Sequence, residues 1–403
     1  MDTSKIREKF KSLYGTEATL YASPGRVNLI GEHTDYNGGY VFPCALSFAT
    51  FLAISKNDKQ EINFRSMEQG YAITVPISCL SELCYDLQDL RDRSKEKWFL
   101  PKGTWANYPL GVFAQFVKEG IKFNEGYDIL ISGNVPLGAG LSSSAALEVV
   151  TAFALNDQLG TNYDRTKLAK MGQKAEHEFA GVMCGIMDQF ASANGKKDHA
   201  IFLNCDTLQF DLVPVVLDGA KIVITNTHSP HKLETGTYNQ RVKECGIALE
   251  QLQSARPGLK NLAELSQEEF DKIKSSIKDP VALKRARHVV GEVQRTVDAV
   301  KALKAGDIVK FGKLMNASHV SLRDDYEVTG LELDTLAEEA WKVDGVIGSR
   351  MTGGGFGGCT VSIVKDNAID AFKEKVGKAY KAKTNLTAEF YIAEIGDGAI
   401  KLN

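Results

Sequence analysis

Residues 133–146 read GNVPLGAGLSSSAA, a glycine-rich turn and three serines that directly precede a helical pattern. Glycines let the backbone turn tightly, and serine is a favoured residue at the start of a helix, where its side chain caps an N–H group. The first turn of a helix has further unpaired N–H groups that suit an anion. We therefore predict a polyphosphate site here, with the hydroxyls of Ser142, Ser143 and Ser144 near phosphate or Mg²⁺. A capped helix after a tight turn is the alternative without a ligand.

Two familiar nucleotide-binding motifs are excluded. A Walker A loop ends in Gly-Lys-Ser or Gly-Lys-Thr after a four-residue gap, and the chain contains no such segment. Residues 353–358, GGGFGG, satisfy the spacing of the Rossmann motif, but the strand-like CTVSIV follows them instead of a helix. We expect a tight hairpin at this stretch, or a close approach of its backbone to a phosphate or to the phosphate loop.

The length of 403 residues exceeds what one hydrophobic core usually serves, so two domains are expected. We place them at residues 1–205 and 206–403, with a ligand cleft between them. Both halves mix helical and strand-like segments, which predicts an α+β fold. Helices are expected at residues 1–15, 102–117, 141–159, 167–179, 238–252, 283–303 and 308–318, and strands within 18–54 and at 127–131, 201–203, 222–225 and 359–364.

Composition and charge limit the kinds of partner and the cellular compartment that can be expected for this chain. Hydrophobic residues make up 43% of the chain and the net charge is −3, from 48 basic and 51 acidic residues, so no broad positive field is available to nucleic acid or an anionic membrane. The seven cysteines form no CxxC pair, which argues against a disulfide framework and a zinc site. The first residues lack the pattern of a secretion signal, and no apolar run is long enough to span a membrane. We expect a cytoplasmic protein; the sequence does not set its oligomeric state, and we expect a monomer.

A second polar segment, residues 23–39, reads SPGRVNLIGEHTDYNGG and places Arg26, Glu32, His33 and Asp35 within ten residues. Sugar hydroxyls both donate and accept hydrogen bonds, and adjacent carboxylate and imidazole groups can recognise their orientation. Glu32, His33 and Asp35 suit that task. Taken singly, Asp35 also fits a plain turn, and a lone histidine is more often a satisfied hydrogen-bond partner.

A third segment, residues 175–194, reads AEHEFAGVMCGIMDQFASAN and contains two carboxylates. Glu176 lies near a predicted helix end, and Asp188 follows a mostly apolar stretch. A buried carboxylate needs a partner, and Arg26 is the candidate for Asp188. The opposite charge would keep Asp188 ionised at neutral pH. A purely structural ion pair would have the same sequence pattern.

Together these motifs resemble the small-molecule kinase family of galactokinase, homoserine kinase, mevalonate kinase and phosphomevalonate kinase, over almost the whole chain. PxGxGLSSSA at residues 136–145 resembles the phosphate loop of the family, and GGGFGG resembles its C-terminal glycine motif. GRVNLIGEHTDYNGG at residues 25–39 resembles the galactokinase signature specifically. The resemblance implies a two-domain fold with mixed sheets and helices and an active site in the cleft between the domains.

The resemblance also implies a reaction. The γ-phosphoryl group of Mg-ATP would be transferred to the anomeric O1 of galactose, giving galactose 1-phosphate and ADP, the first committed step of galactose catabolism in the Leloir pathway. Asp188 and Arg26 would be catalytic at the reacting hydroxyl. Galactose would be bound by Glu32, His33, Thr34, Asp35, Gly185, Asp188 and Tyr238.

The resemblance also implies which residues bind the metal ion and the nucleotide. Mg²⁺ would be held by Ser144 and Glu176. The region around Trp105 would lie near the nucleotide. ATP would be bound by Ser66, Gly138, Ala139, Gly140, Leu141, Ser142, Ser143 and Ser144.

Two alternative functions stay open. The first is a regulatory sensor that binds galactose and ATP without catalysis, for which a damaged phosphate loop is expected. Ser144, Ala145 and Asp188 are all present, which favours catalysis. The second is an N-acetylgalactosamine kinase, whose pocket needs room beside C2 of the sugar.

Overall fold

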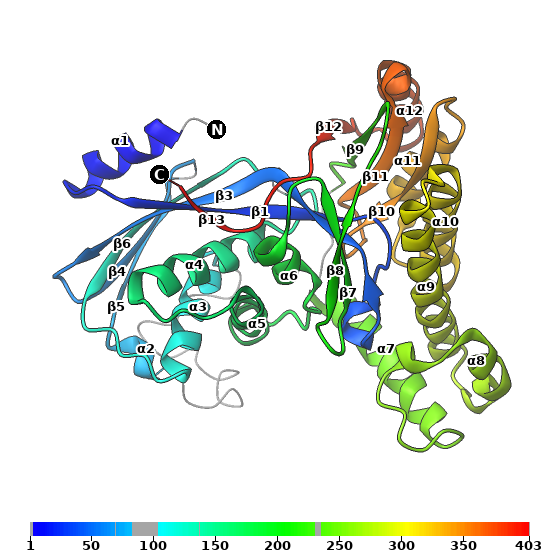
Figure 1. The fold of residues 1–403 in the computed structure, drawn as a ribbon, viewed down its shortest axis with the longest axis horizontal. Coiled ribbons are helices and arrows are strands. Elements are labelled where there is room, and N and C mark those ends of the chain that lie inside the picture. Colours follow the sequence, from blue (N-terminus) through cyan, green and yellow to red (C-terminus); the bar gives the residue numbers. More distant parts are fainter. Residues whose placement is uncertain (1–2, 69, 83–103, 137, 230–234, 403) are drawn as a thin grey trace.

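The computed structural model describes residues 3–68, 70–82, 104–136, 138–229 and 235–402, and Figure 1 shows three sheets side by side with helices on their faces. The strands of the largest sheet are β1 (Thr19–Asn28), β3 (Pro43–Asn57), β4 (Glu61–Ser66), β5 (Ala72–Pro76), β6 (Gly126–Gly133) and β13 (Ile400–Leu402). They lie in the order β13-β1-β3-β6-β4-β5, and neighbours are antiparallel except β4 and β6, which are parallel.

This six-stranded sheet is covered on both faces, which explains why β1 is almost wholly buried. Successive side chains of a strand point to opposite faces. Leu20 and Ala22 pack against Ile6 and Phe10 of helix α1 (Thr3–Tyr14), whereas Tyr21 packs into the core on the other side. That second face is covered by α2 (Cys79–Glu82), α3 (Asn107–Lys118), α4 (Ser143–Leu159), α5 (Arg165–Ala175) and α6 (Met187–Asn194).

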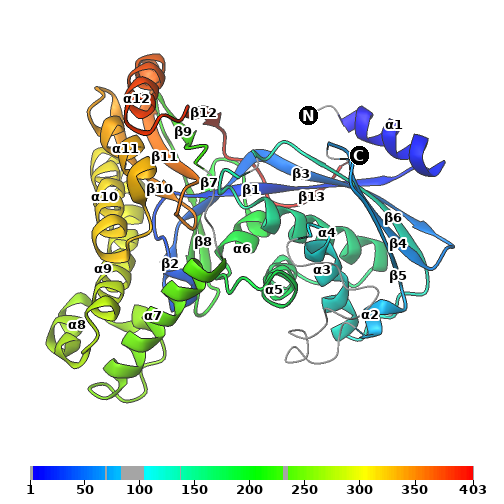
Figure 2. The same cartoon turned by 180° about the vertical axis from the view of Figure 1, so that it is seen from behind.

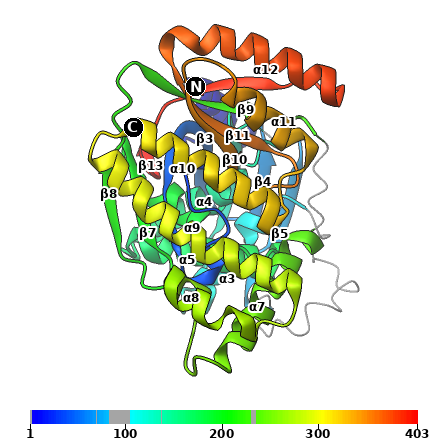
Figure 3. The ribbon, with the colours of Figure 1, turned by 90° about the vertical axis from the view of Figure 1, so that its right-hand side faces the viewer.

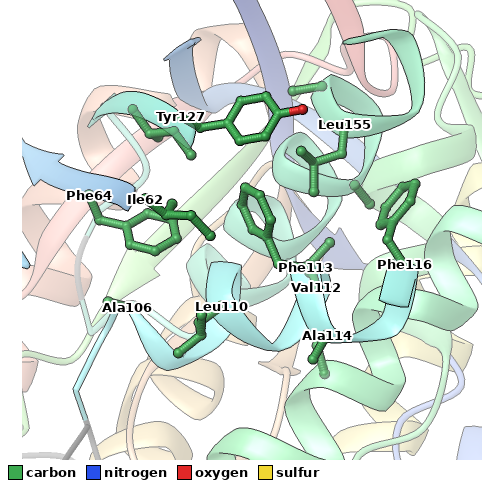
Figure 4. Packing of buried hydrophobic residues seen from close by; sticks show 14 of the residues in the cluster. Ile62, Phe64, Ala106, Leu110, Val112, Phe113, Ala114, Phe116, Tyr127 and Leu155 are labelled. Atoms are coloured by element: carbon green, nitrogen blue, oxygen red, sulfur yellow. The ribbon is translucent and has the colours of Figure 1, made fainter. Parts of the chain in front are cut away.

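The core under this sheet is rich in aromatic residues. Figure 4 shows Phe113 and Phe116 of α3 pointing toward the sheet residue Tyr127 and Leu155 of α4. The Phe113 and Tyr127 rings meet edge to face with centroids 5.6 Å apart, a favourable arrangement for aromatic pairs. This packing fixes α4, and therefore the turn that precedes it, against the sheet.

A small sheet lies in the middle of the molecule in Figures 1 and 2. It consists of β2 (Tyr40–Val41), β7 (His199–Asn204) and β8 (Phe210–Pro214), all antiparallel.

The third sheet is antiparallel, in the order β10-β11-β9-β12, and is built from β9 (Ala220–Asn226), β10 (Val346–Thr352), β11 (Cys359–Lys365) and β12 (Glu389–Ala393). The helices of the second half are α7 (Thr235–Gln253), α8 (Gln267–Ile273), α9 (Pro280–Lys304), α10 (Ile308–Ser321), α11 (Gly330–Trp341) and α12 (Ile369–Thr384). Helices α10, α11 and α12 contact this sheet, whereas α7 and α8 contact α9. In Figure 3 the long helices α9 and α10 lie next to each other in front of the sheet. Asp279 caps α9, and Pro280 begins it, where its missing N–H costs nothing.

The predicted α+β class is confirmed, and each predicted helix has a counterpart within a few residues. Residues 102–103 of the predicted helix 102–117 lie outside the described residues, and Pro109 is in the first turn of α3, where proline is tolerated. The division at residues 205 and 206 stays a prediction. The last strand, β13, pairs with β1, and the Arg7 Nη2 of α1 donates to the Leu402 carbonyl at 3.2 Å, so α1 and β13 are in contact at the six-stranded sheet. Among the described residues no helix is long and apolar enough to cross a membrane.

Candidate active site

A cavity of about 410 Å³ lies where the three polar segments meet, and Tyr238 of α7 and the GGGFGG turn complete its wall. Most residues predicted to contact sugar or phosphate line it. They are Arg26, Glu32, His33, Asp35, Gly138, Gly140, Leu141, Ser142, Ser143, Ser144, Glu176, Gly185, Asp188 and Tyr238.

Arg26 and Asp188 form the ion pair predicted from the sequence. Arg26 lies on β1 just after an irregularity in the β1–β3 register, and Asp188 lies in the first turn of α6. The Arg26 Nε and Nη2 donate to the Asp188 Oδ1 and Oδ2, each at 2.8 Å, and Nη1 donates to the Gly140 carbonyl at 2.7 Å. A two-pronged pair of this kind holds the carboxylate in one plane. The guanidinium therefore ties Asp188 to the phosphate loop.

The Ser142 hydroxyl binds Asp188 and does not cap α4. Its Oγ donates to the Asp188 Oδ2 at 2.5 Å, whereas no side-chain hydrogen bond caps α4. Ser142 adopts a left-handed backbone with φ 59°, outside the extended region typical of a capping residue. A hydrogen bond to an ionised acceptor is stronger than a neutral cap, so the carboxylate takes the hydroxyl.

The GGGFGG turn lies against the phosphate loop, and two predictions for it are confirmed: it joins β10 to β11 as a hairpin, and its backbone approaches the loop. A Cβ at Gly353 would come within 3.0 Å of the Gly140 carbonyl, and both residues have positive φ, 86° and 67°. A side chain at position 353 would therefore push the two segments apart.

Glu32 is 1% exposed, and its Oε1 is heavily hydrogen-bonded. It accepts from the Arg350 Nη1 at 3.3 Å, from the Thr352 Oγ1 at 3.1 Å and from the Gly353 N–H at 2.8 Å. These donors come from β10 and the turn that follows it, so the second half of the chain orients the Glu32 carboxylate.

His33 is buried in a cluster of aromatic rings. Its Nδ1 lies 2.9 Å from the Tyr36 hydroxyl, and its ring centroid is 5.6 Å from that of Tyr238. Burial, together with His288 and Arg241 nearby, lowers the pKa of His33 to about 3. The imidazole is therefore neutral at physiological pH and has one donor and one acceptor nitrogen.

Asp35 and Gly185 are in direct contact. A Cβ at Gly185 would overlap the Asp35 carboxylate, so only glycine fits there beside it. Burial, with the charges of Asp188 and Glu32, raises the pKa of Asp35 to about 7. The nearby Thr34 is not among the cavity-lining residues, because its hydroxyl donates to the Gly31 and Tyr40 carbonyls at 3.0 and 2.8 Å and shapes the loop.

Ser144 and Glu176 offer two oxygen donors at the phosphate end of the cavity. The Ser144 Oγ donates to the Glu176 Oε1 at 3.3 Å, and the Gln189 Nε2 donates to Oε2 at 2.6 Å. Burial and the Asp188 charge raise the pKa of Glu176 to about 7. In the part of the chain that the structure describes, no group of three or more His, Cys, Asp or Glu side chains could hold a metal. A hydroxyl and one carboxylate nevertheless fit Mg²⁺, which usually completes its shell with water and substrate phosphates.

A second cavity of about 350 Å³ adjoins the first and shares Tyr108, Ser143 and Ser144 with it. Ser66 and Trp105, predicted near the nucleotide, line this second cavity. Ala139, also predicted at the nucleotide, is fully buried and packs in the core that contains Val135 and Leu141.

Comparisons with known proteins agree with this geometry. The galactokinase galactose-binding signature matches residues 8–56, the GHMP kinases N terminal domain residues 107–196 and the GHMP kinases C terminal model residues 299–382. The galactokinase of Fusobacterium nucleatum is 50% identical over 397 residues, which is 98% of each chain. That of Lactiplantibacillus plantarum is 45% identical and covers all of both chains. The chain belongs to the galactokinase family. It is accordingly an ATP-dependent sugar kinase.

Solved structures support the same assignment. The crystal structure of Lactococcus lactis galactokinase complexed with galactose matches this galactokinase-family chain with a TM-score of 0.92 and 42% identity, over 100% of each chain. Methanococcus jannaschii mevalonate kinase matches with a TM-score of 0.64 and 17% identity, over 95% of this chain and 100% of that one, which shows the shared fold alone.

Sequence reasoning missed several buried polar residues around this galactokinase-family site. Arg350 and Glu292 are both 0% exposed, and Gln189 donates to Glu148 as well as to Glu176. One signal was available: Arg350 stands in SRMT, a strand-like segment directly before GGGFGG, where a charge needs a partner. Glu292 lies in a helical pattern rich in charges and had no such signal.

Proposed function

We propose that this chain transfers the γ-phosphoryl group of ATP to the anomeric O1 of galactose, with the sugar in the cavity of about 410 Å³ and the nucleotide base in the adjoining one. The observation that carries this proposal is the Asp188 carboxylate, held by Arg26 and Ser142 where residues 23–39, the sugar loop, meet the phosphate loop. The complex of the Lactococcus lactis relative with galactose supports the choice of sugar.

In this mechanism Asp188 receives the proton of the sugar hydroxyl. Phosphoryl transfer passes through a loose transition state, so the attacking oxygen needs little early deprotonation and a weak base suffices. The O1–phosphorus bond forms as the bond from phosphorus to the β–γ bridging oxygen breaks, and ADP leaves with that bond's electrons. Arg26 and the backbone amides of residues 138–144 stabilise the charge on the transferred group.

The other predicted residues would read the sugar hydroxyls. Glu32 and Asp35 supply acceptors, and the neutral imidazole of His33 and the hydroxyl of Tyr238 supply both donors and acceptors. Gly185 leaves the space that the Asp35 carboxylate needs. Thr34 keeps the loop in shape through its two carbonyl contacts.

Mg²⁺ would be held by the Ser144 hydroxyl and the Glu176 carboxylate. When bound, the ion would neutralise charge on the ATP phosphates. Gln189 fixes one oxygen of Glu176, and the Ser144 hydroxyl meets the other, so both groups are oriented before the ion arrives.

The cytoplasmic location, the monomeric state and the domain division at residues 205 and 206 stay predictions from the sequence.

The test is release of ADP from Mg-ATP with galactose, N-acetylgalactosamine, glucose or mevalonate offered separately, with the product identified by phosphorus NMR. We expect turnover with galactose and a 1-phosphate product. Galactose binding without ADP release would instead identify a sensor. Faster turnover with N-acetylgalactosamine than with galactose would identify the other sugar as the substrate.

A further inference from the structure

We propose that Arg350, Ser318 and Glu292 are positioning residues that hold Glu32 in its sugar-binding orientation. This inference rests on the proposed function, because it takes Glu32 as a contact of galactose. It assigns a role to side chains from α9, α10 and β10, none of which is among the residues that line the cavity.

The four side chains form a closed ring of hydrogen bonds. The Arg350 Nη1 donates to the Glu32 Oε1 at 3.3 Å, and the Arg350 Nε donates to the Ser318 Oγ at 3.2 Å. The Ser318 Oγ in turn donates to the Glu292 Oε1 at 2.5 Å. The Glu32 backbone N–H donates to that same Glu292 Oε1 at 3.4 Å, which closes the ring. The network therefore holds Glu32 at its main chain and at its side chain together.

Helix α9 supplies a further contact to the same residue. The His288 Nε2 lies 3.1 Å from the Glu32 carbonyl, and Glu292 also accepts from the Gly31 N–H at 3.0 Å. Residues four apart share one face of a helix, so His288 and Glu292 meet the sugar loop side by side. The N–H, the carbonyl and the carboxylate of Glu32 are thus all bound by the second half of the chain.

The charges in the ring are matched. Burial alone would raise the pKa of Glu292, but Arg295, His288 and Arg350 lower it to about 2, so it stays ionised. The Arg295 Nε pairs with the Glu292 Oε2 at 2.7 Å, and two arginines therefore balance the Glu292 and Glu32 carboxylates. An unpaired charge in this setting is strongly unfavourable, which restricts the ring to one arrangement.

The ring also determines which oxygen of Glu32 is available. Arg350, Thr352 and the Gly353 N–H all donate to Oε1, and within the described residues no hydrogen bond reaches Oε2. Because Glu32 lines the cavity, Oε2 is the oxygen left for a sugar hydroxyl. The proposal predicts that loosening the ring weakens galactose binding and leaves ATP binding unchanged.

The experiment compares Ser318→Ala and Arg350→Met in the full-length enzyme by steady-state kinetics. We expect the galactose KM to rise about fivefold in Ser318→Ala, the loss that one buried hydrogen bond corresponds to, and about tenfold or more in Arg350→Met. The ATP KM should stay within about twofold, since residues far from the change act independently. If Arg350→Met does not fold, Ser318→Ala decides the question.

Ser362→Ala is the matched control. Ser362 is also 0% exposed, and its hydroxyl bonds the Ser349 hydroxyl at 2.8 Å outside the ring. A merely structural role predicts the same small change in galactose KM for Ser318→Ala and Ser362→Ala, and that result would overturn the proposal.

Glu32→Ala separates this proposal from the proposed function. An unchanged galactose KM in Glu32→Ala would show that Glu32 does not contact the sugar. Both the assignment of Glu32 to the galactose site and the positioning role of the ring would then be wrong. If Glu32→Ala raises the galactose KM, adding Ser318→Ala to it should change the KM by less than about twofold, because Ser318 acts through Glu32. A full additional fivefold rise would overturn the ring's role alone.

Discussion

Arg26 and Asp188, 162 residues apart in the sequence, share two hydrogen bonds of 2.8 Å, and the arginine's remaining nitrogen binds the Gly140 carbonyl of the phosphate loop. One buried guanidinium therefore positions the acceptor carboxylate relative to the phosphate-binding backbone. In phosphoryl transfer, where positioning and charge stabilisation dominate, this relationship links the two substrates.

Replacing Arg26 with lysine should lower turnover more than it weakens sugar binding. Lysine keeps the charge but cannot form the two parallel bonds to Asp188 and the third to Gly140. We expect kcat to fall about 100-fold, the order of loss seen when one preorganised donor is removed. Steady-state kinetics with galactose checks this. A kcat within a few fold of the wild type would show that the paired geometry is not needed.

Gly185→Ala should displace the Asp35 carboxylate. We expect the galactose KM to rise about tenfold, because overpacking of a dense site typically costs about 1–3 kcal/mol. The measurement is the KM for galactose and for ATP, of which only the first should change.

Gly246→Ala is the control for that substitution. Gly246 lies in α7 with no atom near its added Cβ, so the change should stabilise the helix by about 0.5–1 kcal/mol and leave both KM values alone. Equal galactose KM values in Gly185→Ala and the wild type would contradict the close packing of position 185 on Asp35.

Asp35→Asn should raise thermal stability, by an amount that grows between about pH 4 and about pH 7 and keeps its full size at higher pH. In the unfolded chain Asp35 loses its proton near the ordinary pKa of 3.8, and in the folded protein near about 7. Between these pH values the folded state binds more protons than the unfolded state, so the free energy of unfolding falls as pH rises. The full cost of ionising the buried Asp35 carboxyl is present above about pH 7. Asparagine removes a cost of up to about 4 kcal/mol, since each pKa unit corresponds to about 1.4 kcal/mol.

The measurement is the Tm of both proteins without ligand at about pH 8 and about pH 4. The variant should melt higher at the first pH, and the difference should disappear at the second. A wild type that melts higher than the variant at alkaline pH would refute the raised pKa.

Ser144→Ala and Glu176→Gln should increase the Mg²⁺ concentration needed for half-maximal turnover by about tenfold or more, because loss of a metal-site group typically costs that much affinity. Titration of ADP release with Mg²⁺ at fixed ATP checks the expectation. Thr151→Ala is the control: Thr151 lies on α4, its hydroxyl donates to the Leu147 carbonyl, and Thr151 itself lines neither cavity. Equal Mg²⁺ dependence in all three variants would remove Ser144 and Glu176 as metal ligands.

The sequence predicted the local features of the fold better than the pairing of distant segments. The helical spacing of Ile6 and Phe10 indicated α1, and short apolar runs indicated β9 and β11, because these patterns depend on neighbouring residues. That β13 lies beside β1 could not be predicted, since strand order depends on contacts across almost the whole chain.

The same distinction holds at the site. The Arg26–Asp188 pair was predictable because a carboxylate in an apolar stretch needs a cation. The Arg350–Glu32 pair was missed, since its members are 318 residues apart and the sequence does not show which strand covers the sugar loop. The hydrogen bond from Ser142 to Asp188 was not predicted, because Asp188 comes from α6, 46 residues further along the chain.

The most direct test of the account is the turnover of Asp188→Asn with galactose, measured beside the galactose dissociation constant. Asparagine keeps the shape of the side chain but cannot take the hydroxyl proton, so kcat should fall about 10²–10⁴-fold, while galactose binding is partly retained. Equal turnover by the variant and the wild type would contradict the role of Asp188 as the proton acceptor.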